Sequence, residues 1–156
     1  MIRRAKLVDV PQMVKLINHY ANQGQMLGRP LIELYDSIRN FVVAEIDGQI
    51  LGCASLAIVW SDIGEIRSIA VHPEHRGRGI GRAMVEELLR DAADLQLPRV
   101  FCLTYKPEFF KKLGFRDVDK KELPQKVWRD CINCPKFPDC DEISLIIDVL
   151  PNGKKD

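Results

Sequence analysis

The sequence predicts an α/β domain, and two observations lead to this fold class. The chain has 156 residues, of which 46% are hydrophobic and 29% are charged, and this is the composition of one ordinary globular domain. Strand-like apolar runs alternate along it with segments whose apolar residues recur every three or four positions, as on one face of a helix. We therefore expect a single domain over residues 1–150 and a frayed tail at 151–156.

The first part of the chain has the pattern of a strand followed by two helices. Ile2 to Leu7 resembles a short edge strand, and Asp9 can cap a helix that Gly24 ends. The apolar stripe of this helix comprises Val10, Met13, Val14, Ile17, Tyr20 and Ala21. A shorter helix is expected from Pro30 to Ile38, because proline is tolerated in a first turn.

A hairpin is the clearest local prediction. Phe41 to Ile46 and Gln49 to Trp60 are strand-like, and Asp47-Gly48 between them readily takes the positive φ angles of a tight turn. A third strand is expected from Glu65 to Val71, since His72-Pro73 removes a backbone donor and ends it.

The second half begins with a long amphipathic helix from Ile80, which Leu97-Pro98 closes. The remaining predicted elements are a strand, a short helix and two further strands, at Val100–Tyr105, Pro107–Leu113, Phe115–Val118 and Ile143–Val149.

Charge and hydropathy exclude two classes of partner. Twenty-three Lys and Arg against 22 Asp and Glu leave a formal charge of +1, so no global field would attract nucleic acid or an acidic membrane. The longest mostly apolar stretch, Ile50 to Trp60, is too short to span a bilayer. We expect a soluble cytoplasmic protein with a small-molecule substrate, and the sequence leaves a homodimer open.

A glycine-rich turn between the third strand and the long helix is the main candidate for ligand binding. Its glycines let backbone amides converge on an anion at a helix N-terminus, and its arginines add positive charge. The residues concerned are Arg76, Gly77, Arg78, Gly79, Ile80, Gly81 and Arg82. The spacing matches neither a Walker P-loop nor a Rossmann fingerprint, and the turn could also be purely structural.

The segment Ala70-Val-His-Pro-Glu-His-Arg-Gly-Arg-Gly-Ile-Gly-Arg82, followed by the long helix, a strand and Lys112-Leu-Gly-Phe115, resembles the GCN5-related N-acetyltransferase family. The resemblance implies a mixed, twisted sheet with helices on both sides and acetyl-CoA as cosubstrate. It implies that Arg76-x-x-Gly79-x-Gly81 binds the pyrophosphate. The preceding strand, with Ile69, Ala70 and Val71, would pair with the pantetheine arm.

Outside this signature, the chain is similar to the acetyltransferase domain of bacterial N-acetylglutamate synthases. The similar segments are Gly64-Glu65, Ala70-Val-His-Pro73, Leu103-Thr104, Phe109-Phe110, Gly114-Phe115 and Glu122-Leu-Pro-Gln-Lys126. This implies acetyl transfer to the α-amino group of L-glutamate, a step of arginine biosynthesis. Two alternatives stay open: an acetyltransferase acting on glutamine, another small amine or a protein terminus, and a non-catalytic acetyl-CoA-binding regulatory module.

Acetyl transfer needs a base, because an α-amino group with a pKa of about 8 is mostly protonated at neutral pH. Glu65 opens the third strand and matches the glutamate that the resemblance marks as general base. Tyr105, at the end of the next strand, is the candidate general acid for the leaving thiolate. The synthases have a serine-containing loop there, where this chain reads Tyr105-Lys-Pro-Glu108. A solvated carboxylate and a packing tyrosine are the structural alternatives.

A dicarboxylate acceptor also requires cations, and arginine suits their bidentate geometry. Arg29 matches an arginine of the synthases, and Arg67 and Lys106 flank the expected acetyl position on neighbouring strands. Each could equally be a solvated surface charge.

Three cysteines near the C-terminus, Cys131, Cys134 and Cys140, have spacing that would let thiolates hold a structural zinc ion if a fourth ligand completed the tetrahedron. Free thiols and a redox-sensitive pair are the alternatives.

Overall fold

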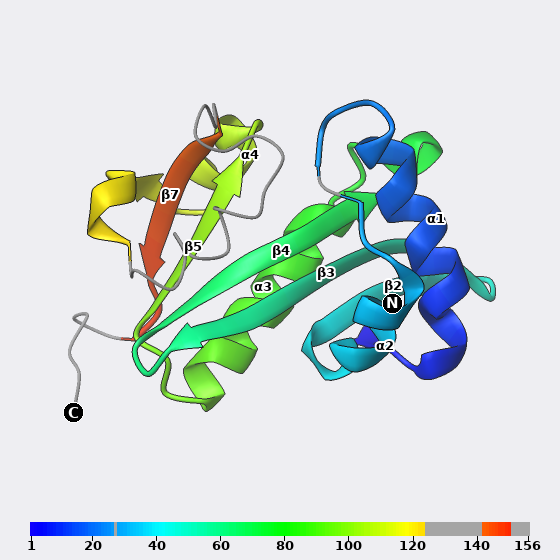
Figure 1. Ribbon diagram of the computed structural model, residues 1–156, viewed down its shortest axis with the longest axis horizontal. Coiled ribbons are helices and arrows are strands. Elements are labelled where there is room, and N and C mark those ends of the chain that lie inside the picture. Colours follow the sequence, from blue (N-terminus) through cyan, green and yellow to red (C-terminus); the bar gives the residue numbers. More distant parts are fainter. Residues whose placement is uncertain (27, 124–141, 151–156) are drawn as a thin grey trace. The chain divides into compact units, whose positions relative to one another are not determined.

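The computed structural model describes residues 1–26, 28–123 and 142–150 (Figure 1). Within these ranges the strands form one mixed sheet in the order β1-β2-β3-β4-β5-β7-β6, flanked by helices, which confirms the predicted fold class. Strands β4 and β5 pair in parallel, whereas the pairs β1–β2, β2–β3, β5–β7 and β6–β7 are antiparallel.

The contacts within the chain define two compact units. The first, here called the N-terminal unit, comprises Met1–Leu56 and Ile66–Asp91, and the second, the C-terminal unit, comprises Ala57–Glu65 and Ala92–Asp156. The long strands β3 and β4 contribute residues to both units. Each unit is therefore described by its own core.

The N-terminal unit holds most of the helices. Its elements are β1 (Ile2–Arg4), η1 (Leu7–Asp9), α1 (Val10–Ala21), α2 (Leu31–Asp36), η2 (Ile38–Asn40), β2 (Phe41–Ile46), η3 (Pro73–His75) and most of β3 (Gln49–Trp60), β4 (Ile63–Val71) and α3 (Ile80–Asp94). The β2–β3 turn has φ of 52° at Asp47 and 77° at Gly48, which confirms the predicted hairpin.

Helices cover both faces of this part of the sheet (Figure 1). The apolar stripe of α1 packs with residues of β2 and β3, among them Val43 and Cys53. The residue before Cys53 is Gly52, and a Cβ added there would lie 2.9 Å from the Met84 side chain of α3. Since successive strand residues point to opposite faces, α1 lies on one face and α3 on the other, and Gly52 permits the close approach of α3.

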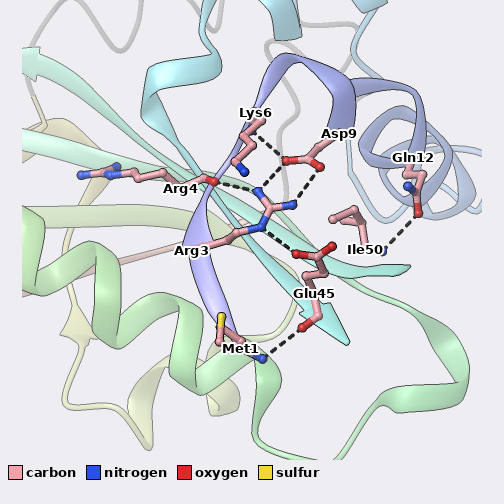
Figure 2. A network of polar contacts seen from close by, with 8 residues as sticks. All are labelled: Met1, Arg3, Arg4, Lys6, Asp9, Gln12, Glu45 and Ile50. Carbon is pink, nitrogen blue, oxygen red and sulfur yellow. Dashed lines mark hydrogen bonds and ion pairs between the residues drawn. The ribbon is translucent and has the colours of Figure 1, made fainter. Parts of the chain in front are cut away.

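A partly buried ion-pair network holds the N-terminal strand to the start of α1 (Figure 2). Arg3 donates two hydrogen bonds to the Asp9 carboxylate, at 2.8 and 3.0 Å, and a third to Glu45 at 2.8 Å. Burial alone raises the pKa of Asp9, but the hydrogen bonds from Arg3 and the Lys6 backbone outweigh it and lower the pKa. Asp9 is the N-cap residue of α1, as predicted, but its carboxylate makes no cap hydrogen bond to the helix.

Two N-terminal elements are shorter than predicted. The first strand ends at Arg4 rather than at Leu7, because the chain turns into η1 and the Lys6 amide bonds Asp9. The second helix ends at Asp36 rather than at Ile38, since the Ser37 hydroxyl donates to the Glu33 carbonyl at 2.7 Å and the backbone then continues as η2.

The C-terminal unit has a smaller core around the other end of β4. Its further elements are β5 (Arg99–Thr104), α4 (Pro107–Lys111), β6 (Arg116–Asp117), η4 (Lys120–Glu122) and β7 (Ile143–Asp148). Ile63, Phe101 and Ile146 meet in the core. Within the described ranges, no helix is both long enough and apolar enough to cross a membrane.

Candidate active site

The glycine-rich turn leaves β4 at Val71 and enters α3 at Ile80, as the sequence predicted. Gly77 and Gly79 have φ of 79° and 82°, a region that residues with a Cβ rarely adopt, and a Cβ at either position would meet no heavy atom within 4 Å. The backbone therefore faces open space at both glycines. The first turn of α3 adds amides without helical acceptors.

Contacts within the turn fix its backbone. The His72 amide donates to the Leu51 carbonyl of β3 at 2.7 Å, and His72 Nδ1 accepts from the Glu74 amide at 3.2 Å. The rings of His72 and His75 meet edge to face, with centroids 5.3 Å apart. Both side chains thus have contacts within the turn, and His75 Nδ1 is buried without a hydrogen-bond partner among the described residues.

The arginines of the turn are held differently. The Arg76 guanidinium lies over the ring of Tyr20, 5.9 Å from its centroid, whereas Arg82 pairs with Glu86 of α3 at 3.2 Å. Open backbone space, helix amides and these cations together fit a pyrophosphate, because such a ligand needs several donors that approach without an obstructing Cβ.

Arg29 packs against β4 in the same unit. Its Nη1 donates to Ser68 Oγ at 3.1 Å, its Nε lies 3.6 Å from the Glu33 carboxylate, and its side chain is only 20% exposed. This Nε is buried and has no hydrogen-bond acceptor among the described residues. Ser68 and Glu33 therefore hold the arginine in one orientation, in which its Nε makes an ion pair but no hydrogen bond within the described residues.

Ser68 is a functional candidate that the sequence did not indicate. It has a φ of 55°, which is rare for serine in a strand. Its carbonyl accepts from the Cys53 thiol at 3.6 Å, and the carbonyl of the preceding Arg67 accepts from Ser55 Oγ at 2.9 Å. Nothing in the residue types around Ser68 signals this conformation, which β3 and Arg29 hold in place.

The C-terminal unit contains Glu65. This residue is 8% exposed and lies opposite Phe101 in the last of the three registered pairs between β4 and β5. Burial raises the pKa of the next β5 residue, Cys102, and the carboxylates of Glu65 and Glu142 raise it further. The predicted base is thus buried, unlike an ordinary carboxylate at a strand end.

Tyr105 and Lys106 follow β5, which ends at Thr104 rather than at Tyr105. The end comes one residue early because the Thr104 hydroxyl accepts from the Lys106 amide at 2.9 Å and turns the chain into α4. Both predicted residues therefore stand in the β5–α4 connection and outside the strand.

Neither described cysteine is suited to act as a nucleophile. Burial raises the pKa of Cys53 to about 12 and raises that of Cys102 as well, and only a thiolate attacks a thioester efficiently. Acyl transfer through either thiol is therefore disfavoured.

The predicted zinc ligands Cys131, Cys134 and Cys140 lie outside the described residues, so the zinc site stays a prediction. Within residues 1–26, 28–123 and 142–150, no three His, Cys, Asp or Glu side chains are grouped as metal ligands.

Known acetyltransferases are similar in sequence to this chain. Residues 12–115 match the family model described as Acetyltransferase (GNAT) family. An amino-acid acetyltransferase of Mycobacterium tuberculosis is 42% identical over 130 residues, which cover 81% of this chain and 74% of the relative. An uncharacterized N-acetyltransferase of Chlorobaculum tepidum is 40% identical over 145 residues, covering 93% of this chain and 94% of the relative.

Two solved structures with bound CoA are also similar to this chain. A Mycobacterium tuberculosis protein in complex with CoA and a ligand designated NLQ superposes with a TM-score of 0.83 and 36% identity, over 96% of this chain and 99% of that one. The N-acetylglutamate synthase of Neisseria gonorrhoeae, complexed with coenzyme A and N-acetyl-glutamate, gives a TM-score of 0.88 and 28% identity, over 97% of this chain but 35% of that one. The chain belongs to the acetyltransferase (GNAT) family and is an acetyl-CoA-dependent N-acetyltransferase.

Proposed function

We propose that the protein is an amino-acid N-acetyltransferase that transfers the acetyl group of acetyl-CoA to the α-amino group of L-glutamate, as in arginine biosynthesis. Relatives named amino-acid acetyltransferase and the likeness to the gonococcal synthase support an amino-acid acceptor. The observation that favours an acidic acceptor is Arg29, a cation that Ser68 and Glu33 hold against β4 and whose side chain is 20% exposed. A carboxylate of the acceptor would pair with the exposed part of this guanidinium.

For the cosubstrate, we assign the pyrophosphate to the turn from Arg76 to Arg82 and the pantetheine arm to the backbone of Ile69, Ala70 and Val71. The open space at Gly77 and Gly79 supports the first assignment. We further propose that residues 1–150 act as one acetyltransferase domain. Acetyl-CoA supplies the activated thioester, and the residues of this chain supply orientation and proton transfer.

The proposed reaction is a direct transfer. Glu65 accepts one proton from the acceptor ammonium, and the neutral amine nitrogen bonds to the thioester carbonyl carbon to give a tetrahedral intermediate. The C–S bond breaks as this intermediate collapses, and Tyr105 is proposed to donate a proton to the leaving thiolate. The second proton of the nitrogen is released as the amide forms and restores the Tyr105 hydroxyl. Arg29, with Arg67 and Lys106, would hold the two carboxylates of the acceptor. The raised pKa values of Cys53 and Cys102 support a route without an acyl-enzyme.

Replacing Gly79 with valine should raise the KM for acetyl-CoA by roughly tenfold or more, which corresponds to about 1.4 kcal/mol of lost binding. The branched side chain would occupy the open space where the pyrophosphate is expected, and the φ of 82° would be strained. Gly48→Val is the matched control, because Gly48 has a φ of 77° and equally open surroundings but lies in the β2–β3 hairpin. Equal CoA affinity in both variants would show that the pyrophosphate does not bind at this turn.

The acceptor is tested with a panel of amino acids and amines, with release of the CoA thiol as the readout. We expect kcat/KM to be highest for L-glutamate, with glutamine poorer because its side chain carries no charge for a cation to bind. A preference for glutamine, another amine or a peptide terminus would show that glutamate is not the acceptor, whereas the acetyltransferase activity would stand. CoA binding without turnover of any acceptor would favour the regulatory module.

A further inference from the structure

One side chain of α1 contacts the glycine-rich turn at two points, and its role is not explained by packing alone. Tyr20 lies in the last turn of α1, where it is 8% exposed and belongs to the core of the N-terminal unit. A tyrosine at such a position fills space as a phenylalanine would, so its hydroxyl calls for a separate explanation.

The first contact is a hydrogen bond. The Tyr20 hydroxyl donates to the carbonyl of Val71, the last residue of β4, at 2.5 Å. The amide of the next residue, His72, donates to the Leu51 carbonyl of β3. The exit of the chain from β4 into the turn is thus fixed from both α1 and β3. Burial raises the pKa of Tyr20, so the hydroxyl keeps its proton and remains a donor at neutral pH.

The second contact lies five residues further along the turn. The Arg76 guanidinium lies over the Tyr20 ring at 5.9 Å from the centroid, within the range of a cation–π interaction. Such a contact restricts the long, flexible side chain of Arg76. Its guanidinium N–H groups can still donate hydrogen bonds to a ligand. Tyr20 therefore links the start of the turn to its first arginine.

We infer that Tyr20 is a positioning residue for cosubstrate binding: its hydroxyl fixes the end of β4, and its ring holds Arg76 in the orientation that a pyrophosphate requires. The inference rests on the proposed assignment of the pyrophosphate to this turn. Tyr20 itself does not touch the cosubstrate in this account. By ordering the turn and Arg76 in advance, Tyr20 lowers the conformational entropy that is lost when acetyl-CoA binds.

Two variants of Tyr20 separate its two contacts. Tyr20→Phe removes only the hydroxyl and should raise the Kd for CoA by about 3- to 10-fold, the usual worth of one hydrogen bond. Tyr20→Leu removes the ring as well and should raise it by roughly 10- to 50-fold. In both variants, kcat at saturating acetyl-CoA and the KM for the acceptor should stay within about twofold of the wild type, because the loss concerns cosubstrate binding only.

Two further variants control for stability and for the tyrosine chemistry. Ile17→Val changes the buried face of the same helix without reaching the turn, so it should lower Tm while leaving the Kd for CoA unchanged. Tyr35→Phe removes a hydroxyl from the exposed face of α2 and should change neither quantity. A purely structural role of Tyr20 would give the pattern of Ile17→Val.

Arg76→Ala distinguishes failure of this inference from failure of the proposed site. Calorimetric titration with CoA should show weaker binding in Arg76→Ala, and adding Tyr20→Leu to it should cost less than Tyr20→Leu costs in the wild type. Unchanged binding in Arg76→Ala would overturn the proposed pyrophosphate site and this inference with it. Weaker binding in Arg76→Ala with wild-type binding in Tyr20→Phe and Tyr20→Leu would overturn the inference alone. If Tyr20→Leu does not fold, the Kd of Tyr20→Phe decides.

Discussion

Glu65→Gln is expected to lower kcat by about 10²- to 10⁴-fold at neutral pH, the usual contribution of one positioned proton acceptor. The amide keeps the size of the side chain but cannot take a proton from the acceptor ammonium. Because Glu65 is buried beside β5 rather than solvated, water is a poor substitute for it. CoA affinity should not change, since the substitution keeps the size of the side chain and leaves the turn that we assign to the pyrophosphate untouched.

The pH profile provides the more specific measurement. The α-amino group of the acceptor is mostly protonated at neutral pH, and the share that is already deprotonated and needs no base grows as the pH rises. The deficit of Glu65→Gln should therefore shrink as the pH rises from 7 to 9.5, with release of the CoA thiol as the assay. A deficit that is constant across this range would indicate a structural effect.

Glu45→Gln is a suitable control for Glu65→Gln. Glu45 is also a strand glutamate, and it binds Arg3 at 2.8 Å within the network of Figure 2. Its neutralisation should lower stability and leave kcat close to that of the wild type. Full activity of Glu65→Gln at pH 7 would show that another group is the base.

The sequence was sufficient for elements whose signals are local. Asp47-Gly48 predicted the hairpin because positive φ angles favour these residue types, and the glycines at 77 and 79 predicted the turn for the same reason. The sequence could not predict the contacts of residues whose partners lie far away along the chain. Tyr20 was predicted only as part of an apolar stripe, because the Val71 carbonyl that it binds lies 51 residues away.

Asp9 and Ser68 show why composition and spacing are not enough. An aspartate before a helix is usually a cap, yet here Arg3 competes for the carboxylate and binds it through two hydrogen bonds. Serine has no preference for a positive φ, so the conformation of Ser68 arises from the contacts around it. Arg29 was a candidate through resemblance, but its partners could not be read from the chain.

Arg29→Ala should lower kcat/KM for glutamate by roughly 10- to 150-fold, because a hydrogen bond to a charged group is worth about 1.5–3 kcal/mol. Most of this loss should be in the KM for glutamate, and the KM for acetyl-CoA should change little, since the lost interaction belongs to acceptor binding. The side chain is 20% exposed and is fixed by Ser68. Little conformational freedom therefore remains to be lost when a carboxylate binds.

Three variants show whether the effect belongs to the guanidinium and its position. Arg29→Lys keeps the charge but loses the planar donors, so it should recover only part of the affinity for glutamate. Glu33→Gln removes the carboxylate 3.6 Å from Arg29 Nε and should not weaken glutamate binding, because Glu33 neutralises part of the charge that would attract an acidic acceptor. Arg90→Ala removes an exposed arginine that pairs with Glu87 on α3 and should leave all constants unchanged. If Arg29→Ala raises the KM for acetyl-CoA as much as that for glutamate, Arg29 supports the fold of the site and the acceptor carboxylate binds elsewhere.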